Sequence, residues 1–372
     1  MARSGFDEVV LLTGFPSFRA RAVCAELLAS PRTYVHAIVL PKLAAEAAQA
    51  LAPLPEASRS RLNLIEGDVA SLDMGLSGAE WHALCSEINI IHHAASITYL
   101  GIQREVAAHV NINGAREVLE FAANTKDLRA FVMHSTAHVA GDRRGVVLES
   151  ELRAGQRFAN AVEETWARAE LIVQKARDRV PIVVLRPATL ICDSRTGEVD
   201  RLDGPYFLIQ LILTSPPDVA LPLPGGGELP LHVVPVDFVA RAACAIGRDP
   251  RAIGATFHLV DPAPQTARQF FELVAAAGGH AAPRGAIPAN LTAALLRTPG
   301  LERFAKSPRA FVDSLVRPVT FDSTNTARLL AGSGISCPSL ETYVDKLVSY
   351  AQQRITEKKR RPSESAILAA QP

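Results

Sequence analysis

The first 190 residues alternate between short apolar stretches and longer amphipathic ones, and this alternation constrains the fold more than any other feature. The apolar stretches have the length and composition of strands buried on both faces. They cover residues 9–12, 35–40, 62–65, 88–91, 130–133 and 182–185. Helical patterns fill the gaps at 19–29, 43–51, 79–86, 106–123 and 162–177. Because parallel strands need a helix-length connection, the pattern predicts an α/β fold with a doubly wound parallel sheet.

The pattern changes after residue 190, where Pro and Gly become frequent up to residue 232. A strand and helix pattern returns over 233–247, a strand follows at 256–260, and the chain is mostly helical from about 266. We therefore expect a Rossmann-type core over 1–190, completed by about 233–262, with 233–247 returning to the main sheet. A smaller C-terminal substrate or cap region would cover 191–232 and 263–352. We expect 355–372 to be a disordered tail.

Charge, apolar runs and cysteines exclude several classes of function. The 372 residues include 39 basic and 38 acidic ones, and this balance argues against nucleic-acid binding. No apolar run is long enough for a membrane span, and the short charged N-terminus does not resemble a signal peptide. The five cysteines are scattered without CxxC spacing. They indicate reduced thiols, no metal site and a cytoplasmic protein.

The turn after the first apolar stretch carries part of a phosphate-binding pattern. Gly14 keeps the first glycine place, whereas Ser17 and Ala20 stand at the second and third. The Ser17 side chain intrudes where phosphate approaches, and Pro16 removes a backbone donor. The N-terminus of the following helix still attracts an anion. Both a dinucleotide loop and a purely structural turn fit this pattern. The candidate cofactor contacts here are Thr13, Gly14, Ser17, Phe18, Arg19 and Ala20.

The end of the second apolar stretch bears on the choice of cofactor. An acidic residue usually stands here to bind the ribose hydroxyl of NAD, and this chain has none. Lys42 would suit a 2′-phosphate instead, so the sequence favours NADP(H) and leaves NAD(H) open. The alternative is an ordinary exposed lysine.

Short motifs follow the later strand ends in a specific order. They are Gly67-Asp68-Val69, His92-His93-Ala94-Ala95, Val110-Asn111-Ile112-Asn113-Gly114, Ser135-Thr136-Ala137-His138 and Leu185-Arg186-Pro187-Ala188. Together they resemble the extended short-chain dehydrogenase/reductases over about residues 8–265. The nearest resemblance is to the thioester-reductase and fatty-acyl-reductase branch, the male sterility type.

The resemblance implies a role for each matching position. Asp68 and Val69 would lie near the adenine, and Ala94, Ala95 and Pro187 would line the cofactor cleft. Asn111 would be the structural asparagine of the active site, and Thr136 would hold the substrate carbonyl oxygen. For Thr136 the alternative is a hydroxyl that caps a loop at the strand end.

The residues that such a family needs for proton transfer are missing. The resemblance expects a tyrosine and, four residues later, a lysine on the same helical face. Val162 and Trp166 occupy these positions and would form an apolar wall. No tyrosine occurs between residues 99 and 206, and no lysine between 126 and 175, so no other alignment restores the pair. General acid catalysis contributes about 10²–10⁴-fold, so ordinary carbonyl reduction should be nearly lost.

Other polar residues nearby offer little replacement. His138, two residues past Thr136, is a candidate proton donor or a hydrogen-bonded loop histidine. Glu163 and Glu164 are expected on the solvated side of their helix.

Four functions remain open, and chemical grounds favour a residual thioester reductase least. The sequence narrowly favours an atypical NAD(P)H-dependent reductase-like protein that acts on a bulky hydrophobic substrate, such as an acyl group or a secondary metabolite. Hydride transfer to a cationic or conjugated acceptor requires no proton donor. The alternative is a pseudoenzyme that binds nucleotide or lipid and acts through a protein partner, and the third is a structural scaffold. The oligomeric state stays open.

Overall fold

The structure is a computed structural model, and it describes residues 5–99, 102–200, 204–288, 315 and 317–360. The chain divides into two compact units. Unit 1 comprises the described residues of 1–190, 232–262 and 318–337, and unit 2 those of 191–231, 263–317 and 338–372. We expected 318–337 in the cap region. That expectation is wrong, because this segment pairs and packs with elements of unit 1.

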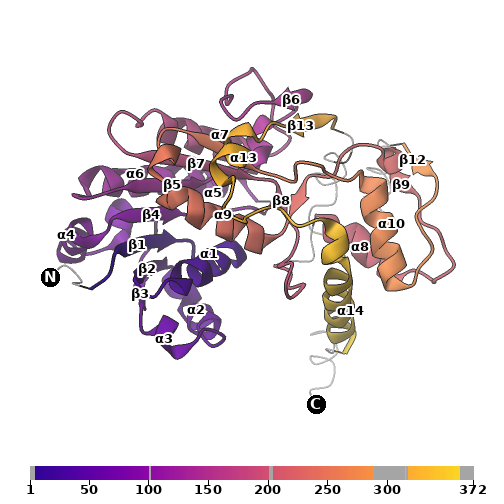
Figure 1. Ribbon diagram of the computed structural model, residues 1–372, viewed down its shortest axis with the longest axis horizontal. Helices are drawn as coiled ribbons and strands as arrows, with labels where there is room; N and C mark the ends of the chain where they lie inside the picture. The colour runs from indigo at the N-terminus through magenta and orange to yellow at the C-terminus, as the bar shows by residue number, and fades with distance from the viewer. Residues whose placement is uncertain (1–4, 100–101, 201–203, 289–314, 316, 361–372) are drawn as a thin grey trace, which may run out of the picture. The chain divides into compact units, whose positions relative to one another are not determined.

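The centre of unit 1 is a sheet of seven parallel strands, which confirms the predicted fold class (Figure 1). The strands are β1 (Glu8–Thr13), β2 (Thr33–Val39), β3 (Leu62–Glu66), β4 (Ile90–His93), β5 (Ala130–His134), β7 (Ile182–Pro187) and β11 (Thr256–Leu259). Their order is β11-β7-β5-β4-β1-β2-β3. The chain therefore winds outward in both directions from β1 and β4. Ligands of such sheets bind at this switch point, outside the carboxyl ends of the strands.

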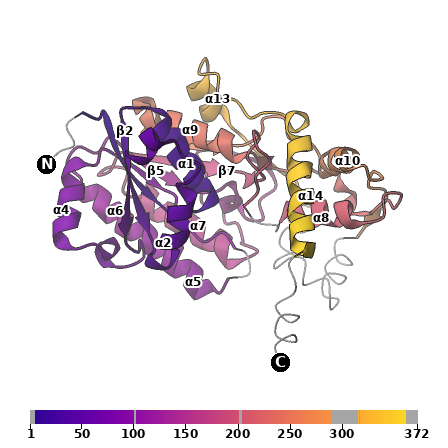
Figure 2. The ribbon, with the colours of Figure 1, turned by 90° about the horizontal axis from the view of Figure 1, so that it is seen from below.

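Helices cover both faces of the sheet, as Figure 2 shows. One face carries α1 (Phe18–Ala29), α2 (Ala44–Ala50) and α9 (Val236–Arg248). The other carries α4 (Gly78–Glu87), α6 (Gly114–Asn124) and α7 (Ala161–Gln174). Successive strand residues alternate between the two cores: Val10 packs in one and Leu11 in the other. Both faces are buried, and this is why the strands are mostly apolar.

Shorter elements connect these layers. They are α3 (Glu56–Arg59), α5 (Arg104–Ala108), a π-helical turn (His109–Asn113) and the 3₁₀ turns Pro41–Leu43, Leu72–Gly75, Ala137–Ala140, Gly225–Gly227, Pro250–Ala252 and Leu340–Thr342. The helix expected over 106–123 is thus α5 and α6, joined by a π-helical turn. No helix in the described part of the chain combines the length and apolar character that a bilayer-spanning segment needs.

Two small parallel pairs lie outside the main sheet of unit 1. In one, β10 (Val233–Val234) pairs with β8 (Thr189–Leu190); in the other, β13 (Val319–Phe321) pairs with β6 (Gly145–Val147). The expected return of 233–247 to the main sheet is therefore wrong for the strand. Only α9 packs on the sheet, and β11 supplies the seventh strand. After β13, α13 (Thr324–Leu330) packs beside β11.

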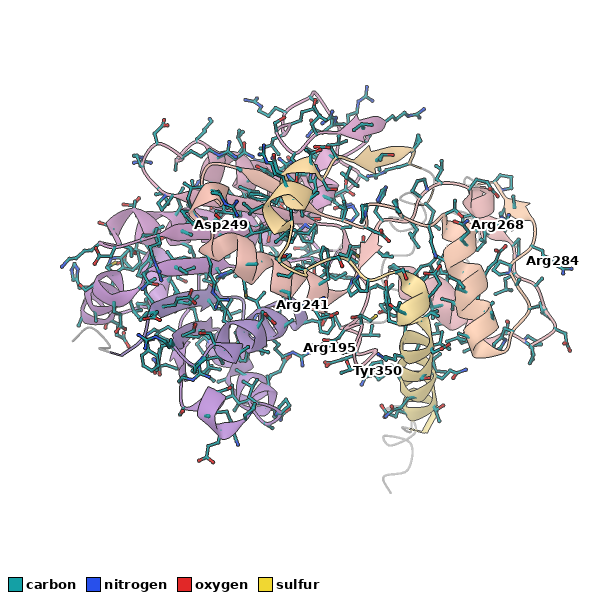
Figure 3. All side chains as sticks on the ribbon, in the orientation of Figure 1. Arg195, Arg241, Asp249, Arg268, Arg284 and Tyr350 are labelled. Atoms are coloured by element: carbon teal, nitrogen blue, oxygen red, sulfur yellow. The ribbon has the colours of Figure 1, made fainter. Side chains whose placement is uncertain are left out.

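Unit 2 is a small helical unit. It contains α8 (Pro205–Thr214), α10 (Ala267–Gly278), α14 (Val344–Arg360) and the pair β9 (Leu223–Pro224) with β12 (Ala286–Ile287). Arg268 extends from α10 (Figure 3) and its Nη2 donates to the carbonyl of Gly226 at 2.7 Å. Because α14 continues to Arg360, a tail starting at residue 355 is wrong. The rest of that expected tail, 361–372, lies outside the described residues.

Candidate functional site

The turn after β1 packs directly against the loop after β4. Gly14 has a φ of +86°, and a Cβ there would lie 2.7 Å from the backbone of Ala95. Only glycine fits both the backbone angle and the contact. Gly14 is therefore explained by the packing of two loops, without any phosphate.

Thr13 holds the loop after β4 by hydrogen bonds. Its hydroxyl oxygen accepts hydrogen bonds from the backbone nitrogens of Ala94 and Ala95, at 3.2 and 3.1 Å. A hydroxyl has one proton to donate, and the remaining partner is Nδ1 of His93 at 3.0 Å. His93 thus accepts at Nδ1. Burial, together with the charge of Arg19, lowers its pKa to about 4, so the ring is neutral.

Ser17 caps the N-terminus of α1. Its side chain accepts a bond from the backbone nitrogen of Ala20, and its own nitrogen donates to the carbonyl of Gly14 at 2.9 Å. The Ser17 hydroxyl therefore takes one of the helix donors that a phosphate would use. The first turn of α1 contains no acidic residue, so the helix end keeps its positive character.

Arg19 does not point to solvent from this turn. It is 8% exposed, and its Nη2 donates to the carbonyl of Ala94 at 3.0 Å and to Oγ of Ser96 at 2.9 Å. Its Nη1 lies 3.5 Å from the carbonyl of Ser135. These acceptors stand beyond the carboxyl ends of β4 and β5. The guanidinium therefore lies inside the cleft at the switch point.

Val162 and Trp166 close the cleft on the side of α7. Both are buried and belong to one apolar cluster. The Arg19 guanidinium lies over the Trp166 ring, 5.3 Å from its centroid, in the range of a cation–π contact. The indole Nε1 donates to the carbonyl of Ile97 at 3.2 Å. The two positions at which the resemblance expects a hydroxyl and an ammonium are thus an apolar wall covered by an arginine.

Asn111 holds the loop after β4 in place from the other side. Its Oδ1 accepts from the backbone nitrogen of Ile97 at 2.8 Å, and its Nδ2 donates to Oγ1 of Thr165 at 3.0 Å. It lies in the π-helical turn, a distortion that is frequent at functional sites. Its bonds position the backbone of the loop.

The cavity that remains is small. Its volume is about 10 Å³, room for little more than one water molecule. It is lined by His93, Ala95, Ser96, Asn111, Met133, His134, Trp166 and Ala169. Small-molecule sites usually enclose about 300–1,000 Å³. A nicotinamide therefore does not fit beside Arg19 and Trp166 as they stand.

Thr136 and His138 lie at the end of β5 and are half-buried. The Thr136 hydroxyl accepts from the backbone nitrogen of His138 at 3.2 Å, which is the loop-capping arrangement. The His138 ring lies 2.9 Å from the hydroxyl of Thr189 through Nε2. Both side chains are engaged in holding their loops.

A buried ionic network under the cleft was not predicted from the sequence. Glu170 and Arg186 are both fully buried, with Nη2 of Arg186 2.6 Å from Oε1 of Glu170. Ser135 donates its hydroxyl proton to Oε2 of Glu170 at 2.5 Å. Two signals existed: Glu170 follows Trp166 by four residues on the same helical face, and Arg186 interrupts an otherwise apolar strand. The network anchors the end of β5 to α7 and β7.

Three buried histidines lie at the ends of β4 and β5, and two of them, His93 and His134, line the small cavity. His92 and His134, on adjacent strands, face each other with Nδ1 and Nε2 3.0 Å apart. Burial lowers the pKa of His92 to about 3 and holds the pKa of His134 well below its usual value. These rings are neutral, so one nitrogen donates and the other accepts. Nδ1 of His134 has no hydrogen-bond partner among the described residues.

The remaining expected residues are spread along the strand ends. Lys42 is exposed after β2, and Asp68 is half-buried after β3, where Oδ1 accepts from the nitrogen of Ala70 at 2.9 Å. Val69 and Pro187 are buried. Glu163 is also buried and accepts from the nitrogen of Ala159 at 3.1 Å, so its expected place on the solvated side is wrong. The described residues contain no group of three His, Cys, Asp or Glu that could hold a metal ion.

The sequence of this chain is similar to those of several known proteins. The profile of an NAD-binding family described as Male sterility protein matches residues 12–243. A linear gramicidin synthase subunit of Brevibacillus parabrevis is 25% identical over 326 residues, 82% of this chain and 6% of that protein. Fatty acyl-CoA reductase wat of Drosophila melanogaster is 24% identical over 219 residues, 51% of this chain and 42% of that protein. The chain thus spans less than half of each of these two relatives.

Solved structures share the fold over nearly the whole length. The terminal R domain from the myxalamid PKS-NRPS biosynthetic pathway has a TM-score of 0.80 at 23% identity, covering 95% of this chain and 93% of that one. UDP-glucuronic acid 4-epimerase from Bacillus cereus, in complex with NAD, has a TM-score of 0.68 at 19% identity, covering 94% and 98%. At these identities the likeness concerns the fold alone.

Proposed function

Because the chain belongs to the male sterility protein family, we propose that it is a non-catalytic member that keeps the reductase fold and has lost carbonyl reduction. One observation carries the proposal. Val162 and Trp166, both buried, stand where proton donor and activating cation are expected. An alkoxide forming there has no proton source, and this loss alone is worth about 10²–10⁴-fold.

The neighbouring polar groups do not replace the missing acid. The Ser135 hydroxyl donates its proton to Glu170. The Thr136 hydroxyl, which accepts from the His138 backbone, is aliphatic and a much weaker acid than the phenol of a tyrosine. The role that remains for this cleft is binding. We propose that the protein binds a nucleotide and acts through a protein partner. In support, relatives that match most of this chain include a synthase subunit and a terminal domain from a biosynthetic pathway.

An atypical reductase is the second candidate. It is favoured by the polar lining of the small cavity, where His93, Ser96, Asn111 and His134 remain. This candidate requires Arg19 to leave its place over Trp166, because NAD(P)H would have to supply hydride there. An acceptor that is cationic or strongly conjugated would need no acid. Exposed Lys42 at the end of β2 favours the 2′-phosphate of NADP(H) over NAD(H). The substrate would be hydrophobic, such as an acyl group.

Turnover measured by the absorbance of the reduced cofactor tests the proposal. The purified chain is mixed with NADPH or NADH and with octanal, octanoyl-CoA or a conjugated enone, and cofactor oxidation is followed. We expect background rates with all acceptors. Turnover of octanal or octanoyl-CoA would overturn the proposal, and turnover of the enone alone would establish the second candidate.

A matched pair of variants checks the cause. Val162→Tyr with Trp166→Lys restores hydroxyl and ammonium on one helical face. Val162→Phe with Trp166→Met changes the same bulk without either group. If the missing pair is the reason for inactivity, only the first double variant should gain rate, provided that it binds cofactor in a titration. Equal gains in both would refute this reason.

A further inference from the structure

Arg19 crosses the cleft and is held there by polar and aromatic contacts. From α1 its Nη2 reaches the carbonyl of Ala94 at 3.0 Å and Oγ of Ser96 at 2.9 Å. The guanidinium lies over Trp166, 5.3 Å from the ring centroid. A side chain that is 8% exposed and held by two charge-assisted bonds is a fixed part of the cleft wall.

The position of this arginine divides the cleft unequally. Its acceptors follow β4 and β5, on one side of the switch point. The ends of β2 and β3, with exposed Lys42 and half-buried Asp68, lie on the other side. A dinucleotide laid across β1 would place its adenine half toward β2 and β3, and its nicotinamide half where Arg19 stands.

We infer that Arg19, stacked on Trp166, is a built-in occupant of the nicotinamide place, and that the cleft selects adenine nucleotides that lack a nicotinamide. This inference rests on the proposed function, because it names the ligand class of the same cleft. The N-terminus of α1, free of acidic residues in its first turn, and Lys42 supply the positive charge for phosphates. The cavity of about 10 Å³ beside Trp166 leaves no room for a second ring.

Titration calorimetry with two probes tests the selection. NADPH and 2′,5′-ADP share the adenosine 2′-phosphate, and only NADPH carries the nicotinamide. The full chain should bind 2′,5′-ADP at least as tightly as NADPH. Arg19→Leu should tighten NADPH at least about tenfold, the equivalent of one bond to a charged group, and leave 2′,5′-ADP unchanged. Tighter binding of NADPH by the unaltered chain, or no binding of either probe, would overturn the inference.

Arg21→Leu is the matched control. Arg21 lies on the same turn of α1, with its guanidinium 5.8 Å from the Phe18 ring centroid. Its loss removes the same charge from the helix end without opening the cleft. The ratio of the affinities for NADPH and 2′,5′-ADP should therefore stay constant. If Arg21→Leu changes the ratio as much as Arg19→Leu, then charge and not occupancy is responsible, and the inference fails.

Fluorescence reports the position of Arg19 without any ligand. The chain has two tryptophans, so Trp81→Phe leaves Trp166 as the single emitter. In that background Arg19→Leu should increase acrylamide quenching of Trp166, and Arg19→Lys should increase it less. Unchanged quenching in a variant with native circular dichroism would show that Arg19 does not cover the ring. Turnover of octanal or octanoyl-CoA would contradict the proposed function, whereas the affinity ratio of NADPH to 2′,5′-ADP decides this inference. The two failures are therefore distinguishable.

Discussion

Replacing Arg186 with methionine should leave a carboxylate buried without its cation. In the native chain three bonds join Arg186 to Glu170, from Nε at 3.0 and 3.2 Å and from Nη2 at 2.6 Å. Nη1 also donates to the carbonyl of Glu151 at 2.8 Å. Without the guanidinium, Glu170 keeps its bonds from Ser135 and Gln174, which are neutral donors. Breaking one partner of a buried pair costs about 3–5 kcal/mol.

Urea denaturation, followed by tryptophan fluorescence, measures the free energy of unfolding of unit 1, which contains Arg186 and Glu170. Trp81 and Trp166 both lie in unit 1, so their emission reports the unfolding of that unit. We expect the free energy of unfolding to fall by about 3–5 kcal/mol in Arg186→Met. The double variant with Glu170→Leu should recover most of the loss, because an apolar pair of similar volume replaces the ions.

Arg168→Met gives the comparison at the surface of α7, the helix that carries Glu170. The Arg168 side chain is 54% exposed, and its Nη1 lies 3.9 Å from Oε1 of Glu164 in an ion pair. Exposed pairs of this kind are worth about 0–1 kcal/mol. The reasoning about Arg186 is refuted if its variant costs no more than Arg168→Met, or if the double variant costs as much as the two single changes added together.

Three further predictions concern stability. Acidification from pH 6.5 toward 4 should lower the free energy of unfolding by up to about 3 kcal/mol per buried histidine, because the unfolded ring binds a proton that folded His93, with a pKa of about 4, does not. His93→Asn should reduce this slope in urea titrations, and an unchanged slope would contradict it. Gly14→Ala combines a φ of +86° with a clash on Ala95 and should cost at least about 2 kcal/mol, whereas Gly145→Ala, with nothing within 4 Å, should cost about 1 kcal/mol. Thr266→Ala removes the cap of α10 and should cost about 1 kcal/mol in thermal melting by circular dichroism; no change would rule the cap out as a contributor.

The sheet was predictable because its strands carry an apolar signal of their own. The strand expected at 182–185 is β7, and the one at 130–133 is β5. The strand expected at 88–91 is shifted to 90–93, because His92 and His93 look like a strand end. Their polarity is hidden in the fold by His134 and Thr13, partners that no local pattern reveals.

The pairing of β6 with β13 could not be predicted. Each strand has three residues, and their sequence positions differ by more than 170. Strands of this length give no periodicity to read. The partner is chosen by tertiary contacts, which a single sequence does not display.

The positions of site residues that depend on local sequence spacing could be predicted. Those that depend on contacts with distant residues could not. Four-residue spacing puts Val162 and Trp166 on one face of α7, and both lie in one apolar cluster. An arginine in the first turn of a helix is usually solvated, so the course of Arg19 could not be predicted. Its acceptors lie 75 or more residues away. Glu163 differs, because its partner is local: it accepts from the backbone nitrogen of Ala159, four residues earlier, at the start of the helix.

The segment 318–337 also bears on how the chain is made. Glu149, which is buried, accepts from the backbone nitrogens of His258 at 2.8 Å and Asn325 at 2.6 Å, and β13 supplies the partner of β6. A nascent chain therefore completes the seven-stranded sheet once β11 has been synthesised, and waits for residue 337 to close unit 1. By then the ribosome has already made 191–231 and 263–317, which belong to unit 2. Unit 2 in turn needs α14, which is made after residue 337, so neither unit can be completed before most of the other has been synthesised.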